Sequence, residues 1–295
     1  MATYTTFNQI GKAEDVSDII TNITPTDCPM YSLIKSEKVS ARTFDWQEDT
    51  LAAAGVNAAV EGADVTAGTQ SPTTLRTNQC QILVKSFQIS ATADVIKTYG
   101  RAKETAYQMG KTLKEIKRDL ERAYVGVAQA AVADGNGSTA RKMASVTAQI
   151  TGSTDAGSGS TDPLTEAKLL VAGQAAYTAG SEPSVLMIKP ADSLIVSGFA
   201  AASGRNREFA QTKTLVNVID LYVSPFGEYK VVLNRHQLTT HAFLIDPSMW
   251  RTCVLRPFTR TLLAKTGDSD QHMVNYEGSL KHMSFVSDHM ITGLT

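Results

Sequence analysis

The chain has 295 residues, of which 42% are hydrophobic and 19% charged, and its formal net charge is -1. This composition is typical of a globular protein with one large domain or two ordinary ones, and disorder is not the default expectation for the whole chain. No block of basic residues predicts a nucleic-acid-binding surface, and no run of 18 apolar residues predicts a membrane span. The three cysteines are scattered and odd in number, which favours free thiols over a disulfide framework, and no signal peptide is recognisable.

The first forty residues are predicted to form an arm without a core of its own. A short helix is expected over Glu14–Ile20. Pro25 and Pro29 then favour extended structure over regular helix, and apolar residues from Met30 onward would anchor the arm on another surface.

Two strands are expected next, at about residues 41–52 and 82–89, where apolar side chains partly alternate. The stretch between them, from Gly55 to Ile82, is rich in small residues and contains no lysine. An isolated two-stranded hairpin is marginal in water. This hairpin is therefore either unsupported and disordered at its tip, or an arm whose partner lies on another chain.

Residues 98–133 are predicted to form one long helix of about 50 Å at 1.5 Å per residue. Breaks are allowed at its ends, because Gly100, Gly110 and Gly126 each cost about 1 kcal/mol relative to alanine. An apolar stripe at helical spacing supports it: Met109, Leu113, Ile116, Leu120, Ala123, Val127 and Ala131. Charged residues lie on the opposite side. Packing of the stripe against its own domain is favoured over a coiled-coil seam, because alanine and glycine weaken the second half.

The second half of the chain predicts a mixed domain. A helix follows Asp162 as N-cap and Pro163 in its first turn, and it stops at Gly180. A buried strand (184–188), a helix or turn from Pro190, and a hairpin around "SPFGE" come next. Further strands are expected in "HAFLIDPSMW", "CVLRPFTRTLLA" and the closing stretch.

Sequence motifs of catalysis are missing: the chain has no P-loop, no GxGxxG, no GxSxG and no HExxH. The five histidines lack the paired spacing of a zinc site, and structural or exposed histidines are the favoured interpretation. Asp268, Asp270 and Glu277 are better explained by a polar turn than by an acid/base pair. No cofactor is expected.

Four stretches in fixed order resemble the major capsid proteins of tailed bacteriophages, with the Hong Kong 97-like fold. They are "EDVSDIITNITPTDCPMYSLI", "FDWQEDTLAAAGVNAAVEGAD", "GRAKETAYQMGKTLKEIKRDLERA" and "TRTLLAKTGDSDQHMVNYEGSLKH". The resemblance spans most of the chain and is weakest over 140–250. It implies an α+β fold.

The resemblance also implies a division of the chain. Residues 1–40 would be the N-terminal arm and 41–90 the E-loop, an extended β-hairpin that lies across a neighbouring subunit. Residues 91–159 would be the P-domain with its spine helix, 160–250 the A-domain, and 251–295 the returning strands of the P-domain.

The implied function is a major capsid protein that assembles as hexamers and pentamers into an icosahedral shell around double-stranded DNA. The implied partners are a portal and a separate scaffolding protein, because the arm is too short for a fused one. A decoration protein is a further candidate partner. The implied location is the virion, after assembly in the host cytoplasm, without a membrane.

The candidate inter-subunit contacts follow from this picture. Acidic residues at the E-loop tip would meet basic residues on the exposed face of a neighbour's spine helix. The candidates are Trp46, Glu48, Glu61, Asp64, Arg76, Lys114, Lys117, Arg118 and Arg122. In the type member of the fold, an E-loop lysine is cross-linked to a neighbour's asparagine. Here no lysine occurs between Lys38 and Lys85, which excludes that chemistry at the tip.

Three other functions stay open at this point. An encapsulin-like compartment would share the fold but enclose an enzyme. A metal-dependent enzyme would use the histidines, and a coiled-coil fibre or adaptor would need far more helix than the average of about a third.

Overall fold

The computed structural model describes residues 26–62, 64, 68, 70–96, 103–133, 137–155, 162–202 and 221–295. The helix predicted over Glu14–Ile20 lies outside these residues. So do the first residues of the long predicted helix and most of the strand expected before Leu221.

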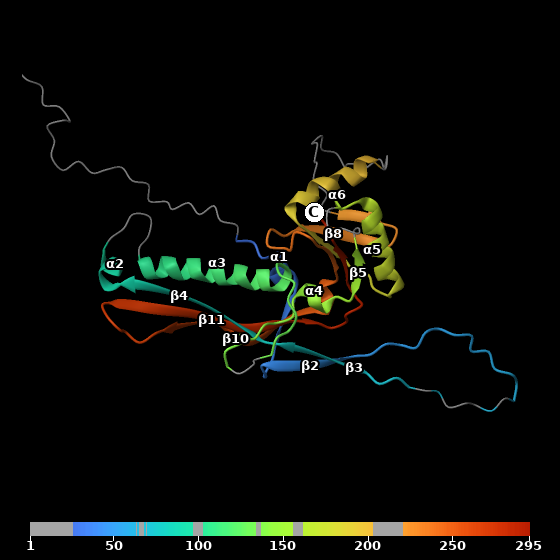
Figure 1. The fold of residues 1–295 in the computed structure, drawn as a ribbon, viewed down its shortest axis with the longest axis horizontal. Coiled ribbons are helices and arrows are strands. Elements are labelled where there is room, and N and C mark those ends of the chain that lie inside the picture. Colours follow the sequence, from blue (N-terminus) through green and yellow to red (C-terminus); the bar gives the residue numbers. More distant parts are fainter. Residues whose placement is uncertain are drawn as a thin grey trace, which may run out of the picture.

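A four-stranded sheet forms one end of the molecule, in the order β1-β10-β11-β4. Its two central strands are long and antiparallel, and β1 pairs with β10 in parallel. The helix α3 (Glu104–Val125) runs along one face of this sheet (Figure 1). The strands are β1 (Lys35–Lys38), β4 (Gln81–Ser90), β10 (Trp250–Leu262) and β11 (Ser269–His282).

A six-stranded mixed sheet forms the other end, in the order β5-β12-β9-β6-β8-β7. The helices α5 (Glu166–Thr178) and α6 (Pro190–Ala202) lie beside this sheet (Figure 1). Its strands are β5 (Gly152–Asp155), β6 (Val185–Ile188), β7 (Leu221–Ser224), β8 (Gly227–Leu233), β9 (Ala242–Ile245) and β12 (His289–Thr292). Short elements complete the described fold: α1 (Pro29–Leu33), α2 (Ala91–Val95), α4 (Val146–Gln149) and the 3₁₀ turn Pro247–Met249.

One core connects the two ends. Ile116, Leu120 and Tyr124 of α3 are completely buried among residues of the four-stranded sheet, and the same cluster includes Met187 of β6 and Phe243 of β9. A second cluster fills the space between α5, α6 and the six-stranded sheet. The first cluster therefore joins α3 and residues of both sheets in one core.

A third, two-stranded unit projects from the body. The strands β2 (Thr43–Glu48) and β3 (Thr74–Gln79) pair in antiparallel fashion, and the described residues between them extend well beyond both sheets (Figure 1). We call residues 43–79 the β2–β3 arm. The prediction that residues 82–89 pair with 41–52 is wrong, because β4 instead pairs with β11 over its whole length. Ile89 is buried in that arrangement, which stabilises it.

The long helix is shorter than its apolar stripe predicted. It ends at Val125, so Val127 and Ala131 lie beyond it, and its 22 residues span about 33 Å rather than 50 Å. Gly126 closes the helix against the neighbouring backbone: a Cβ built there would lie 2.3 Å from the carbonyl oxygen of His236. A helix continuing past this contact would run into that segment.

Two further local predictions were wrong. Pro29 opens the helix α1 instead of keeping the arm extended, since a proline is tolerated at the first helical position. The helix α5 begins at Glu166 and is capped by Thr165, whose Oγ1 accepts a hydrogen bond from the Lys168 amide, rather than by Asp162.

Most second-half elements were predicted correctly, including β6, α6 and the β7–β8 hairpin. Two small strands come from other parts of the chain: β5 lies within 91–159 and β12 within 251–295, and both pair within the six-stranded sheet.

Candidate inter-subunit surface

The root of the β2–β3 arm brings three of the predicted contact residues together within one chain. Alternate residues of a strand share a face, and Trp46 lies opposite Arg76 in the register. The Arg76 Nε lies 2.9 Å from Glu48 Oε2. The other carboxylate oxygen of Glu48 accepts hydrogen bonds from the Phe285 amide at 2.9 Å and the Ser284 hydroxyl at 3.3 Å. The Glu48 carboxylate is thus engaged on its own subunit.

Trp46 is buried in the same place. Its ring lies 5.7 Å from Phe44 and 6.2 Å from Phe285, measured between ring centroids. The guanidinium of Arg76 lies 4.3 Å above the Phe285 ring, which is cation–π distance. Trp46, Glu48 and Arg76 therefore clamp the arm to the body. Sequence reasoning missed Phe285, because nothing in "HMSFVSD" distinguishes it from other turn residues.

The distal part of the arm has the opposite character. Residues 49–60 form no helix or strand and are exposed, including Leu51 (99% exposed), Val56 (99%) and Val60 (79%). Glu61 and Asp64 are also exposed, and Gly62 turns the chain with a φ of +79°. Apolar side chains held away from any core of their own chain indicate a surface that another molecule covers.

The basic candidates lie on the solvent side of α3. Lys114, Lys117 and Arg122 are exposed and Arg118 is half-buried, whereas Ile116 and Leu120 face the core. The β2–β3 arm runs away from α3 (Figure 1). The acidic tip and the basic helix face of one chain are therefore apart, and a contact between them requires two copies.

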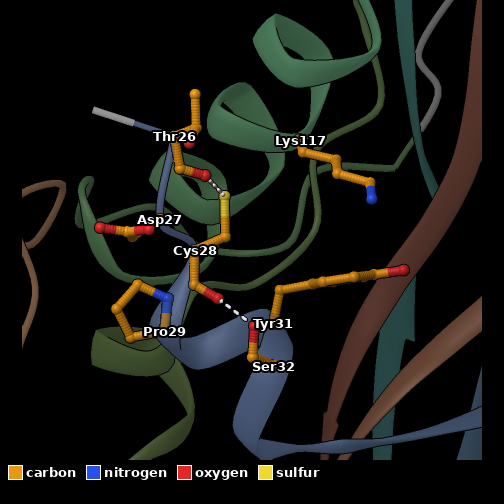
Figure 2. A pocket seen from close by; sticks show the side chains of 7 residues that line it. All are labelled: Thr26, Asp27, Cys28, Pro29, Tyr31, Ser32 and Lys117. Carbon is orange, nitrogen blue, oxygen red and sulfur yellow. Dashed lines mark hydrogen bonds between the residues drawn. The ribbon is translucent and has the colours of Figure 1, made fainter. Parts of the chain in front are cut away.

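Lys117 also borders a pocket of about 340 Å³ beside α1. Figure 2 shows its side chain next to Cys28 and Tyr31, with the Cys28 thiol directed at the Thr26 carbonyl oxygen 3.6 Å away. The Ser32 hydroxyl donates to the Cys28 carbonyl oxygen at 2.9 Å. Burial raises the pKa of the Cys28 thiol to about 11, which makes it a poor nucleophile at neutral pH.

The described residues contain no group of three or more His, Cys, Asp or Glu side chains suited to hold a metal ion. No helix in the described part of the chain combines the length and the apolar composition that crossing a membrane requires.

Comparison with known proteins decides the family. All of residues 1–295 match the family described as SU10 major capsid protein. The chain belongs to the SU10 major capsid protein family. A curated relative, the major capsid protein of Escherichia phage Phieco32, is 31% identical over 328 residues, covering 95% of this chain and 93% of that protein. The SU10 family is one of structural shell proteins rather than enzymes, so the expected function as a phage capsid protein is confirmed.

Solved structures confirm the Hong Kong 97-like fold of this SU10 family member. The cyanophage A-1(L) capsid superposes with a TM-score of 0.67 at 13% identity, covering 98% of each chain. Gordonia phage Cozz gives 0.65 at 10% identity, covering 97% of this chain and 92% of that chain. The SrpI encapsulin of Synechococcus elongatus PCC 7942 gives 0.62 at 8%, covering 100% and 96%. At such identities the likeness shows the fold alone.

Proposed function

We propose that copies of this chain assemble as hexamers and pentamers into a closed icosahedral head that encloses double-stranded DNA. The observation that carries the proposal is the β2–β3 arm, whose exposed Leu51 and Val56 have no core of their own chain. A neighbouring copy would supply that core. The encapsulin alternative has the same fold, but the 31% identical relative is a phage capsid protein.

In this proposal the parts keep the predicted division. Residues 1–40 are the N-terminal arm and 41–90 the E-loop, whose projecting part is the β2–β3 arm. The P-domain comprises 91–159 and 251–295 and the A-domain 160–250, except that β5 and β12 pair within the six-stranded sheet.

The proposed contact joins the arm tip of one copy to α3 of the next. Glu61 and Asp64 would face Lys114, Lys117, Arg118 and Arg122 of the neighbour. All except the half-buried Arg118 are exposed in the isolated chain. A rim ion pair contributes only about 0–1 kcal/mol, but a shell repeats it at every copy.

Charge reversal tests this contact. Glu61→Lys should lower the yield and the melting temperature of particles at low salt, while the subunit stays folded. The second reversal Lys114→Glu should restore both. Glu182→Lys is the matched control, because Glu182 is an exposed acid on the A-domain side, far along the chain from the arm. Glu61→Lys particles that form and melt like the wild type would remove the contact from the account.

The remaining partners are also proposals. We infer a portal and a separate scaffolding protein, with assembly in the host cytoplasm before incorporation into the virion. A decoration protein is a further candidate: one similar structure, of phage G capsid proteins, includes decoration proteins. Mass spectrometry of precursor and mature particles from infected cells tests for the portal, the scaffolding protein and the decoration protein. A scaffold should be present only in the precursor.

A further inference from the structure

The turn between β11 and β12 connects the two sheets. β11 ends at His282 in the four-stranded sheet, and β12 begins at His289 in the six-stranded sheet. The Phe285 carbonyl oxygen accepts hydrogen bonds from the Thr151 amide at 3.2 Å and the Thr151 hydroxyl at 2.8 Å. Thr151 directly precedes β5. The turn is therefore tied to the six-stranded sheet on two sides.

The inner end of this turn is anchored by a buried polar cluster. His282 Nε2 lies 2.7 Å from Asp288 Oδ2, and both side chains are 0% exposed. Asp288 also accepts hydrogen bonds from the Asp246 amide at 2.6 Å and from the Trp250 indole. The His282 ring stacks on Trp250 with centroids 4.0 Å apart. A buried pair with its partners satisfied is costly to disrupt, so this end of the turn has little freedom.

A row of aromatic rings in contact with one another connects this buried cluster to the arm. His282 stacks on Phe285 at 5.6 Å with an interplanar angle of 15°. Phe285 contacts Trp46, and Trp46 stacks on Phe44, so five rings in succession join the core to β2. Arg76 of β3 covers the Phe285 ring. Among these five rings, Phe285 lies in the turn, and its ring contacts both strands of the arm: Trp46 of β2 and Arg76 of β3.

A second attachment lies nearer the base of the arm. The Asn78 side-chain amide donates to the Leu280 carbonyl oxygen at 2.6 Å, and its Oδ1 accepts from the Ala144 amide at 2.8 Å. Asn78 pairs with Phe44, and Glu48 lies four residues farther along β2, about 13 Å at the rise of a strand. One attachment would let a two-stranded ribbon pivot. Two attachments at this separation set its angle.

We propose that Phe285 is a positioning residue that sets the direction in which the β2–β3 arm leaves the body, and ties that direction to the junction of the two sheets. Asn78 fixes the point about which the arm could rotate, and Phe285, which stacks on His282, prevents that rotation. The inference deepens the proposed function, and its consequence for assembly rests on that function. An arm of fixed direction loses less conformational entropy when it binds its neighbour.

The test compares variants of Phe285 by hydrogen exchange. Phe285→Leu keeps an apolar side chain but removes the flat ring on which Arg76 and His282 lie, whereas Phe285→Tyr keeps the ring. Phe226→Leu is the matched control, because Phe226 is also half-buried and packs on Tyr177 at 6.1 Å in the other sheet's layer. The readout is the exchange rate of β2–β3 amides relative to β10–β11 amides in the same sample.

We expect Phe285→Leu to speed exchange of the β2–β3 amides about tenfold while the β10–β11 amides keep their rate, because the arm opens locally. Phe285→Tyr and Phe226→Leu should leave the ratio near wild type. Particle yield on gradients should fall for Phe285→Leu alone. An unchanged ratio, or equal acceleration of both sets, would overturn the inference.

Arg76→Lys keeps the experiment decisive if Phe285→Leu does not fold. Lysine retains a charge for Glu48 but lacks the planar guanidinium over the ring. The ratio should rise in the same direction, and an unchanged ratio would again overturn the inference. Failure of the proposed function is distinguishable, because then the wild-type chain itself forms no closed particles, whatever the exchange ratio.

Discussion

Glu121 holds the N-terminal segment against α3 from inside the core. Its carboxylate accepts hydrogen bonds from the amides of Met30 at 2.8 Å and Tyr31 at 3.0 Å, and from the side chain of Asn234 at 2.6 Å. Glu121→Ala would remove the acceptor shared by these three donors, and each donor left buried and unsatisfied costs about 1–3 kcal/mol in the free energy of unfolding. Urea unfolding measures this. Glu115→Ala on the same helix is the control, because Glu115 is partly exposed and its carboxylate lies 3.5 Å from the Lys85 ammonium group.

The same residue predicts a pH dependence. Burial raises the pKa of Glu121 above its ordinary 4.5, against the hydrogen bonds that lower it. The folded state therefore binds this proton more tightly than the unfolded state. Its stabilising effect is complete below pH 4.5 and is lost as pH rises through the folded pKa. The free energy of unfolding of the wild type should therefore fall relative to that of Glu121→Gln, which does not titrate, as pH rises from 4.5 to neutral. A wild-type free energy of unfolding that rises relative to Glu121→Gln over this range would contradict this assignment.

At the scale of elements, two glycines of one helix predict opposite effects. Gly110 lies within α3 with nothing within 4 Å of an added Cβ, so Gly110→Ala should stabilise the fold by about 1 kcal/mol. Gly126 ends α3 where an added Cβ would lie 2.3 Å from a backbone oxygen, so Gly126→Ala should cost about 1–3 kcal/mol. Thermal or urea unfolding of the two variants side by side decides. Equal effects would mean that Gly126 does not end the helix for steric reasons.

The elements also show what the sequence could predict. The apolar stripe through Ile116 and Leu120 correctly placed the buried face of α3, because helical periodicity is local information. Gly126 is a local signal for the end of α3, but its close approach to the His236 backbone, more than a hundred residues away, is contained in no local pattern. For the same reason β2 was predicted, but its partner β3 was not: strand pairing is a long-range choice.

The candidate site divides in the same way. Exposed charges at Glu61 and Lys114 could be predicted from a polar tip and a helical face. The engagement of Glu48 by Phe285 could not, because the two residues are 237 positions apart and no local pattern brings them together. A carboxylate that looked available in the sequence is thus occupied in the fold.

At the scale of the whole molecule, a shell without covalent bonds between subunits is predicted. No lysine lies between Lys38 and Lys85, and burial raises the pKa of the Cys28 and Cys80 thiols to about 11 and that of Cys253 to about 12. Mature particles on a denaturing gel should give one band at 31.7 kDa, with or without reducing agent. A ladder of multiples that survives reduction would reveal a cross-link from another part of the chain.

The β2–β3 arm is proposed to complete its packing on a neighbouring copy within a closed shell. Cryo-EM reconstruction of particles formed by the chain can show this contact. We expect closed shells in which residues 49–73 have continuous density across an adjacent subunit, with the tip near that subunit's α3. Shells in which the arm folds back onto its own subunit, or a chain that stays monomeric under all assembly conditions, would contradict it.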